Sequence, residues 1–322
     1  MKEIEVTGSI SDIIASLEEW HLFCDINRET WFRGQSSYKD KLVPSIFRHE
    51  KDDGTKIFYN EAGMYEEFIR RYPDHSNSHK NVFEWLTLMQ HYGLPTRLLD
   101  WTTNLLVALF FCCHDDKYKD NDGAVFAFNP SSTLSNNNEF RVFLEILVTS
   151  NCISLFYKRL IDSTSNIFGE KVKINGIWLN DWKSNFLHLN NVVNDLQGNG
   201  VSQFKSFEVY HDITSGNIQA YSDLIGNFSR VYRFKSPHLN PRIRRQHGCF
   251  TFHGGKYFQD REFIKSYDME RSESSLIKIK IRFIDKNRLL KELALSGITE
   301  ATLFPEMEYQ AKQIKEIYTN KP

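Results

Sequence analysis

The chain of 322 residues has few cysteines and none of the spacings in which cysteines work together. Its five cysteines include no C-x-x-C pair, so neither a disulfide framework nor a zinc site is expected. Its eleven histidines include no pair four residues apart with a third ligand, and we predict that no metal is bound. The P-loop, the G-x-S-x-G elbow and the G-x-G-x-x-G turn are also missing. Their absence argues against an NTPase, an elbow-type hydrolase and a Rossmann domain.

Long hydrophobic runs and an excess of one charge are missing as well. The longest apolar run, Leu105–Cys113, is less than half of the roughly 20 residues that a membrane helix needs, so it predicts a buried helix. The first residues lack the apolar segment of a secretory leader. The 40 Lys and Arg residues against 41 Asp and Glu residues argue against a broad basic surface for nucleic acid. We therefore expect a cytoplasmic protein with reduced cysteines and no membrane partner.

The composition that remains is that of a globular protein, with 41% hydrophobic and 25% charged residues. The length lies just above the roughly 250–300 residues at which single cores stop growing. Regular apolar patterns fill residues 1–130 and 231–322, whereas residues 131–230 open with a polar linker and carry no motif. We predict one core built from these two blocks, with an inserted, mainly helical lobe between them.

The apolar spacing predicts helices and strands in both blocks, and the strand–helix–strand order of the first block favours an α+β fold. The alternation of Ile, Lys and Arg in 277–283 predicts a half-buried strand. We predict helices at residues 9–20, 56–72, 82–91, 104–114, 286–295 and 308–318, and strands at residues 30–35, 96–101, 123–129, 231–234, 249–252 and 277–283.

The densest group of polar residues is Gln90–Thr102. Its charged members His91, Arg97 and Asp100 lie where a predicted helix, a turn and a strand meet, just before the next helix. A strand end beside a helix N-terminus binds anions and ligands well. These residues together favour a site. The alternative is that Asp100 or Thr102 merely caps the helix that follows.

An arginine interrupts the aromatic strand Trp31–Gln35. A buried Arg33 must be paired or must reach a ligand, because an unpaired buried charge is expensive. Its guanidinium offers a fork of donors that suits phosphate, and Gly34 beside it permits close backbone approach. A salt bridge from Arg33 to Asp100 or another acid is the alternative.

The strongest basic cluster is formed by Arg242, Arg244 and Arg245, just before a second aromatic strand. From this segment alone, phosphate binding and a solvated loop are equally good interpretations. Cys249 has histidines on either side, but neighbours at these offsets usually pack in the core, so a cysteine nucleophile is a minor alternative.

Four separated motifs in the same order resemble the FRG domain family, a bacterial and phage-encoded family named for its Phe-Arg-Gly motif. A fifth segment fits the C-terminal signature of that family, and the similarity covers about 25–130 and 235–255. The motifs are Phe32-Arg33-Gly34-Gln35, Leu42-x-Pro44-Ser45-x-x-Arg48, Gln90-His91-x-Gly93-x-Pro95-Thr96-Arg97-Leu98-Leu99-Asp100-Trp101-Thr102 and Ala108-Leu109-Phe110-Phe111, followed later by Arg242-Ile243-x-x-Gln246-x-Gly248-x-Phe250.

A weaker resemblance is to the ADP-ribosyltransferases. Those enzymes carry an Arg or His on a first strand, a Ser-Thr-Ser-like triplet at the end of a second, then a helix, another strand and a late Glu. Arg33 stands at the first position, Asp100–Thr102 at the triplet and Gln246 at the Glu. The resemblance implies an α+β fold with a split β-sheet core, and NAD as a substrate without a metal.

The resemblance also implies roles for individual residues. The implied catalytic residues are Arg33, Asp100, Thr102 and Gln246. The residues implied to hold NAD are Arg33, Gly34, Gln35, His91, Thr96, Arg97 and Trp101, the last by stacking on nicotinamide. The residues implied to bind the acceptor are Arg242, Arg244 and Arg245, which favours RNA or DNA over a protein side chain.

Gln246 departs from the transferase pattern, because an amide replaces the usual carboxylate. Loss of nicotinamide creates a cationic, oxocarbenium-like centre that a carboxylate would stabilise. The sequence offers Asp100 or Glu308 for this charge.

The resulting prediction is a NAD-dependent ADP-ribosyltransferase in a toxin or phage-defence setting. An active transferase needs restraint, which implies an inhibitory, antitoxin-type partner, and the lobe at 131–230 is a candidate surface for that partner or the acceptor. Two alternatives stay open. One is a nucleotide or nucleic-acid binding module without chemistry, and the other is a metal-independent nuclease that uses His91 and Asp100.

Overall fold

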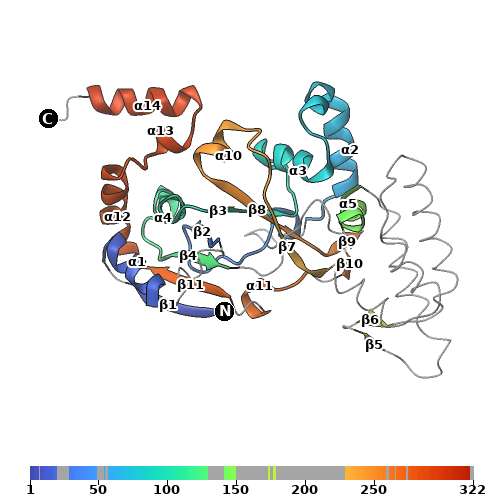
Figure 1. Ribbon diagram of the computed structural model, residues 1–322, viewed down its shortest axis with the longest axis horizontal. Helices are drawn as coiled ribbons and strands as arrows, with labels where there is room; N and C mark the ends of the chain where they lie inside the picture. The colour runs from blue at the N-terminus through green and yellow to red at the C-terminus, as the bar shows by residue number, and fades with distance from the viewer. Residues whose placement is uncertain are drawn as a thin grey trace.

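The computed structural model describes residues 1–6, 8–19, 29–48, 54, 57–129, 141–149, 173–174, 177–178, 229–258, 261–264, 266–272 and 275–319, and it mixes helices and strands (Figure 1). The strands are β1 Lys2–Val6, β2 Trp31–Gln35, β3 Leu98–Thr102, β4 Gly123–Phe128, β5 Lys173–Ile174, β6 Ile177–Trp178, β7 Val231–Phe234, β8 Gly248–His253, β9 Lys256–Phe258, β10 Arg261–Ile264 and β11 Leu276–Ile281. The α-helices are α1 Ile10–Glu19, α2 Glu61–Arg71, α3 Val82–His91, α4 Leu105–Cys113, α5 Arg141–Thr149, α10 Pro241–Arg245, α11 Met269–Ser272, α12 Phe283–Leu295, α13 Glu300–Leu303 and α14 Met307–Tyr318.

Seven strands form one sheet in the order β1-β11-β4-β2-β3-β8-β7. The outer strand β1 runs parallel to β11, and every other pair of neighbours in this sheet is antiparallel. β2 pairs with β4, and β3 with β8, along their whole lengths. In contrast, β2 and β3 share the single pair Phe32–Thr102. The sheet therefore consists of two halves that are joined at one residue pair.

Two helices cover the same face of the sheet, one over each half. On this face α4 packs on β2 and β4, and α12 packs on α4 in turn (Figure 1). Over the other half, the Phe83 ring of α3 contacts the rings of Phe234 and Phe252, which lie on β7 and β8. The opposite face is covered in part by α11, whose Met269 belongs to the same apolar cluster as Trp31 and Trp101. The joint between the halves thus lies between α3 and α4.

The α+β prediction is confirmed, and several elements have the predicted bounds. α3 and β7 match them, whereas α2 begins at Glu61 instead of residue 56. The prediction that the last core strand is half-buried is wrong. Lys278 of β11 is 6% exposed, with its Nζ 4.0 Å from the centroid of the Tyr38 ring, so an aromatic residue covers the face that was expected in water.

Most of the segment 131–230 lies outside the described residues, and so does most of the predicted lobe. Its described helix α5 packs against α2 and α3. No helix in the described part of the chain is both long and apolar enough to span a membrane. Nor do the described residues contain a group of three His, Cys, Asp or Glu side chains that could hold a metal ion.

Candidate functional site

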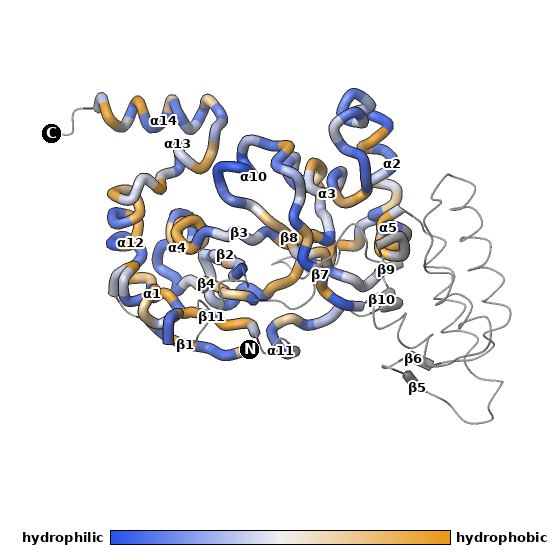
Figure 2. Tube along the Cα trace, viewed as in Figure 1, coloured by the Kyte–Doolittle hydropathy of each residue, from blue (hydrophilic) through white to orange (hydrophobic). Residues whose placement is uncertain are grey.

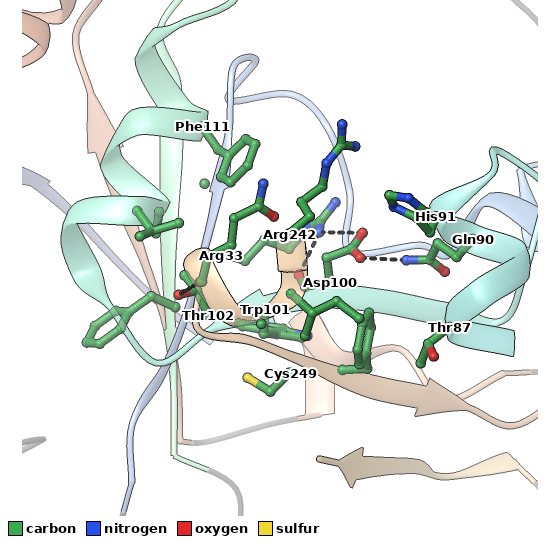
Figure 3. Close-up of a pocket in the computed structure, with 18 of the residues that line it drawn as sticks. Arg33, Thr87, Gln90, His91, Asp100, Trp101, Thr102, Phe111, Arg242 and Cys249 are labelled. Carbon is green, nitrogen blue, oxygen red and sulfur yellow. Dashed lines mark hydrogen bonds and ion pairs between the residues drawn. The ribbon is translucent and has the colours of Figure 1, made fainter. Parts of the chain in front are cut away.

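A pocket of about 350 Å³ lies between α3, α4 and α10, over the joint of the two half-sheets (Figure 3). It brings together residues that are far apart in the sequence, from β2, the α3–β3 segment and α10. The sequence-predicted residues that line it are Arg33, Gly34, His91, Asp100, Trp101, Thr102, Arg242 and Gln246.

Asp100 presents its carboxylate to the pocket. Its side chain is 62% exposed although β3 lies in the middle of the sheet. Of the described residues that line the pocket, Asp100 is the only acid. It does not cap α4, because that role belongs to Asn104, whose Oδ1 accepts a hydrogen bond from the Leu106 amide. The carboxylate is therefore available to a ligand.

Arg33 reaches Asp100 across the gap between the half-sheets. Its Nη1 donates to the backbone oxygen of Asp100 at 2.6 Å and lies 3.8 Å from the Oδ2 atom. Its Nε is buried and has no hydrogen-bond partner among the described residues. Burial lowers the pKa of Arg33 and the Asp100 carboxylate opposes this, so the guanidinium stays charged. The structure thus shows the pairing of Arg33 with Asp100, and Arg33 also lines the pocket, so binding of a ligand by Arg33 stays a prediction.

Gln90 fixes the other side of the Asp100 carboxylate. Its Nε2 donates to Asp100 Oδ1 at 2.6 Å (Figure 3), and its Oε1 accepts a hydrogen bond from the Thr96 hydroxyl. The Thr96 hydroxyl in turn accepts from the Leu98 amide. This series of hydrogen bonds connects the Asp100 carboxylate to the backbone of β3 and so fixes its orientation. Gln90 was not among the predicted site residues, although it opens the motif that contains Asp100.

Thr102 and Gln246 line the pocket, but their side chains are engaged in holding its wall. The Thr102 hydroxyl donates to the Gln246 backbone oxygen at 2.7 Å and accepts from the Asn104 amide. The Gln246 amide donates to the Leu303 backbone oxygen at 3.3 Å. These bonds tie α10 to β3 and to α13, so we assign both residues a positioning role.

Trp101 forms part of the pocket wall and is otherwise buried. It is 3% exposed, its ring centroid lies 5.5 Å from that of Phe128, and its Nε1 donates to the Thr251 hydroxyl. Phe111 of α4 and Phe304 are further aromatic residues of the lining. Phe304 also packs under Arg242, so Phe111 is the better partner for a flat ring in the pocket.

Gly34 is required by helix packing more than by a ligand. A Cβ atom at this position would lie 1.8 Å from the Ala108 backbone oxygen and 2.7 Å from the Cys112 amide nitrogen. Only a glycine lets α4 approach β2 this closely. The predicted close approach is therefore made by a helix of the protein itself.

Three residues predicted to hold NAD do not line the pocket. Arg97 is fully buried; its guanidinium pairs with Glu61 at 2.5 Å and donates to the backbone oxygen of His253. Thr96 takes part in the hydrogen-bond chain to Asp100. Gln35 is buried, and its Nε2 donates to the Lys41 backbone oxygen at 3.4 Å. Their roles in this structure are internal.

Of the three arginines predicted to bind the acceptor, only Arg242 lines the pocket. Its Nη2 pairs with Glu306 at 2.8 Å, its Cζ lies 4.7 Å above the Phe304 ring, and its buried Nε has no hydrogen-bond partner in the described residues. Arg244 and Arg245 lie outside the pocket lining. All three arginines lie on the short helix α10. This helix begins with the N-cap residue Asn240 followed by Pro241, a pattern typical of helix N-termini.

His91 lies beside Arg242 at the pocket. Burial lowers its pKa, and the positive charge of Arg242 lowers it further, whereas Glu306 opposes the shift. His91 is thus neutral at pH 7 and can accept or donate a hydrogen bond. Cys249 also lines the pocket, but burial raises the pKa of its thiol well above the usual value, which disfavours a nucleophilic role.

Glu308, the other acid offered by the sequence, does not line the pocket and lies exposed on α14. The acid next to the pocket from this region is Glu306, which is paired with Arg242. Asp100 is therefore the acid that a ligand in the pocket would meet.

Residues 28–121 match the FRG domain. No curated protein and no solved structure matches the chain. The matched segment contains β2, α3, β3 and α4, and so it supplies Arg33, Gln90 and Asp100. α10 with Arg242 comes from beyond the matched residues and completes the pocket.

Proposed function

We propose that this chain, whose residues 28–121 match the FRG domain, is a NAD-dependent ADP-ribosyltransferase that reacts in the pocket around Asp100. The observation that supports this most is one exposed carboxylate held between an arginine and an amide in a pocket whose described lining contains no other acid. Such a carboxylate suits a reaction in which positive charge develops on a sugar.

The proposed step is transfer at the ribose carbon that bears nicotinamide. The C–N bond breaks and both bonding electrons leave with the nicotinamide nitrogen, which becomes neutral. The positive charge that develops on the ribose lies against the Asp100 carboxylate. The acceptor then forms the new bond to the same carbon with a lone pair and loses a proton to water. Asp100 thereby supplies the charge that Gln246 lacks.

Arg33 and Gln90 are positioning residues in this proposal. Their bonds to Asp100 keep the carboxylate in place before the substrate arrives, so little reorganisation is needed. Because Arg33 lines the pocket and its side chain is 16% exposed, its guanidinium is also placed to donate to a ribose hydroxyl or a phosphate oxygen.

The size and order of the site agree with this proposal. A volume of about 350 Å³ is near the lower end of the roughly 300–1,000 Å³ of ligand pockets, which suits a ribose with its base better than a whole dinucleotide. The phosphates would then lie toward Arg242. The chain order of Arg33, Asp100–Thr102, α4, β4 and a late Gln246 is the order expected of a split transferase sheet.

The setting that we propose is a toxin or phage-defence effector whose acceptor carries phosphate, such as RNA or DNA, with an inhibitory partner that restrains it. Arg242 is the residue of α10 that supports a phosphate-bearing acceptor, because it alone among the three arginines reaches the pocket.

A second candidate function is nucleotide binding without chemistry. The engagement of the Thr102 hydroxyl and the Gln246 amide in wall contacts favours it, because both groups are then withdrawn from the reacting atoms. A nuclease that uses His91 and Asp100 is less favoured, because the described pocket lining offers no second acid or second histidine.

Incubation with NAD that is labelled in its adenosine half separates these functions. The transferase releases free nicotinamide and moves label onto RNA, DNA or protein. The binding module is stabilised against heat by NAD, and all of the NAD is recovered unchanged. Recovery of unchanged NAD with every acceptor would therefore reject the transferase, and RNA cleavage without NAD would support the nuclease.

A further inference from the structure

The C-terminal helix α14 lies at the edge of the molecule (Figure 1), and several of its large apolar side chains are exposed. Met307 is 88% exposed, Ile314 58% and Tyr318 81%. In Figure 2 apolar positions recur along this helix between hydrophilic ones. Single exposed apolar residues are ordinary, but a set of them on one element marks an interaction surface.

Four of the exposed apolar residues of α14 form one stripe. Met307, Ala311, Ile314 and Tyr318 follow the spacing 4, 3, 4, which places them within about 60° of the helix surface. Other positions of α14 pack on the protein: the ring of Tyr309 stacks on Phe304 with centroids 4.7 Å apart, and the Gln310 side-chain amide donates to the backbone oxygens of Ala301 and Phe304. The stripe therefore points away from the body of the molecule.

Two opposite charges lie on the same flank of this stripe. Glu308 and Lys315 are seven residues apart, so they lie two helical turns from each other on one side of the stripe. Both are exposed, and neither forms an ion pair within the described part of the chain. The other flank carries Gln310 and Ile317, which are uncharged.

This pattern is self-complementary in one orientation only. When two identical helices pack face to face in opposite directions, equal flanks meet, so Glu308 of one copy lies opposite Lys315 of the other, twice. In a parallel pair the charged flank would meet the uncharged one. The apolar stripe has nearly the same centre, displaced by one residue or about 1.5 Å along the helix, and in that arrangement Met307 would face Tyr318 and Ala311 would face Ile314.

We propose that α14 is a homodimerisation helix, which pairs antiparallel with α14 of a second copy of this chain about a two-fold axis between Ala311 and Ile314. A single pair of short helices buries less than the roughly 1,200 Å² of a standard interface. The dimer is therefore weak, with a dissociation constant of about micromolar size. This proposal does not depend on the reaction proposed above.

Sedimentation equilibrium of the full chain tests the proposal, over protein concentrations from about 5 to about 200 µM. The wild-type protein is expected to pass from monomer to dimer, and Ile314→Glu is expected to stay monomeric. Ile284→Glu changes an equally exposed isoleucine on α12 and serves as the matched control, which keeps dimerising. Both isoleucines are exposed, so each variant is expected to fold, and circular dichroism checks this.

Charge reversal tests the orientation. Glu308→Lys or Lys315→Glu alone weakens the dimer by about tenfold, because like charges then face each other twice. The double variant Glu308→Lys with Lys315→Glu restores wild-type affinity. The proposal is overturned by a chain that remains monomeric at every concentration, by a dimer that persists in Ile314→Glu, or by a double variant no tighter than the single ones.

Discussion

The guanidinium of Arg33 donates to the backbone oxygen of Asp100 at 2.6 Å, beside the one residue pair that joins β2 to β3. Continuing the register of Phe32 and Thr102 would place Gly34 opposite Asp100, yet β2 and β3 form no second pair there. The Arg33 side chain thus donates to the Asp100 backbone oxygen, which in a longer β2–β3 ladder would accept from a backbone amide of β2. It holds the two half-sheets together at the pocket.

We predict that Arg33→Gln lowers the free energy of unfolding by about 2 kcal/mol, the size of a hydrogen bond from a charged donor. It should also remove the stabilisation of the fold that NAD binding provides. Urea unfolding with and without NAD measures both effects. Arg70→Gln, which changes an exposed arginine of α2, is the control and should alter neither. Unchanged unfolding of Arg33→Gln would contradict the role given to this contact.

Gly34→Ala should destabilise the protein by more than 3 kcal/mol, because the new methyl group would meet the Ala108 backbone at 1.8 Å and α4 would have to move. Gly93→Ala is the matched control. Gly93 has a φ of 83° but open space around it, so its cost is limited to about 1–2 kcal/mol of backbone strain. Chemical unfolding compares the two, and equal losses would contradict the close packing of α4 on β2.

Glu61→Gln should destabilise the chain by about 3–5 kcal/mol, because it leaves the buried Arg97 guanidinium without its counter-charge. The double variant Glu61→Leu with Arg97→Met removes both charges and should be more stable than Glu61→Gln. Denaturant unfolding of the single and double variants measures the difference. A double variant less stable than Glu61→Gln would contradict this prediction. It would show that the backbone acceptors of Arg97 are enough to stabilise its guanidinium when the Glu61 charge is absent.

Acid should destabilise the protein through His253. Burial lowers its pKa to about 3, with the positive charges of Arg97 and Arg33 adding to the effect. As the pH falls below about 6.5, the usual pKa of histidine, His253 binds a proton in the unfolded chain but not in the native state. His253 therefore costs about 1.4 kcal/mol of stability per pH unit between pH 6.5 and the folded pKa.

Unfolding of wild type and His253→Asn between pH 7 and about pH 4.5 tests this linkage. The variant is expected to lose less stability on acidification than the wild type, whatever its stability at pH 7. Parallel pH profiles would contradict the neutral, buried state of His253.

Local patterns predicted the elements whose residues contact near neighbours. The helix Val82–His91 has the expected bounds because Asn81 caps it and Gly93 follows it. Lys2–Val6 was missed, since its strand state depends on parallel pairing with residues about 275 positions later. The same holds for Lys278, which is buried because Tyr38 covers it.

The site was predictable where its residues cluster in the sequence. Asp100 and Arg33 emerged from dense motifs, and the structure brings them together. Arg97 looked equally suited to a ligand, because a sequence cannot show that Glu61 lies beside it. Likewise, Arg244 and Arg245 resemble Arg242, and only the geometry of α10 shows which of the three faces the pocket.

The most direct test of the proposed reaction is nicotinamide release from NAD by Asp100→Asn, which keeps the size of the side chain and removes its charge. Asp74→Asn, which changes an exposed carboxylate outside the pocket, is the control. We predict that Asp100→Asn releases nicotinamide at least about 100-fold more slowly than the wild type, while NAD still stabilises it against heat. Release at the wild-type rate by Asp100→Asn would contradict the central role of this carboxylate.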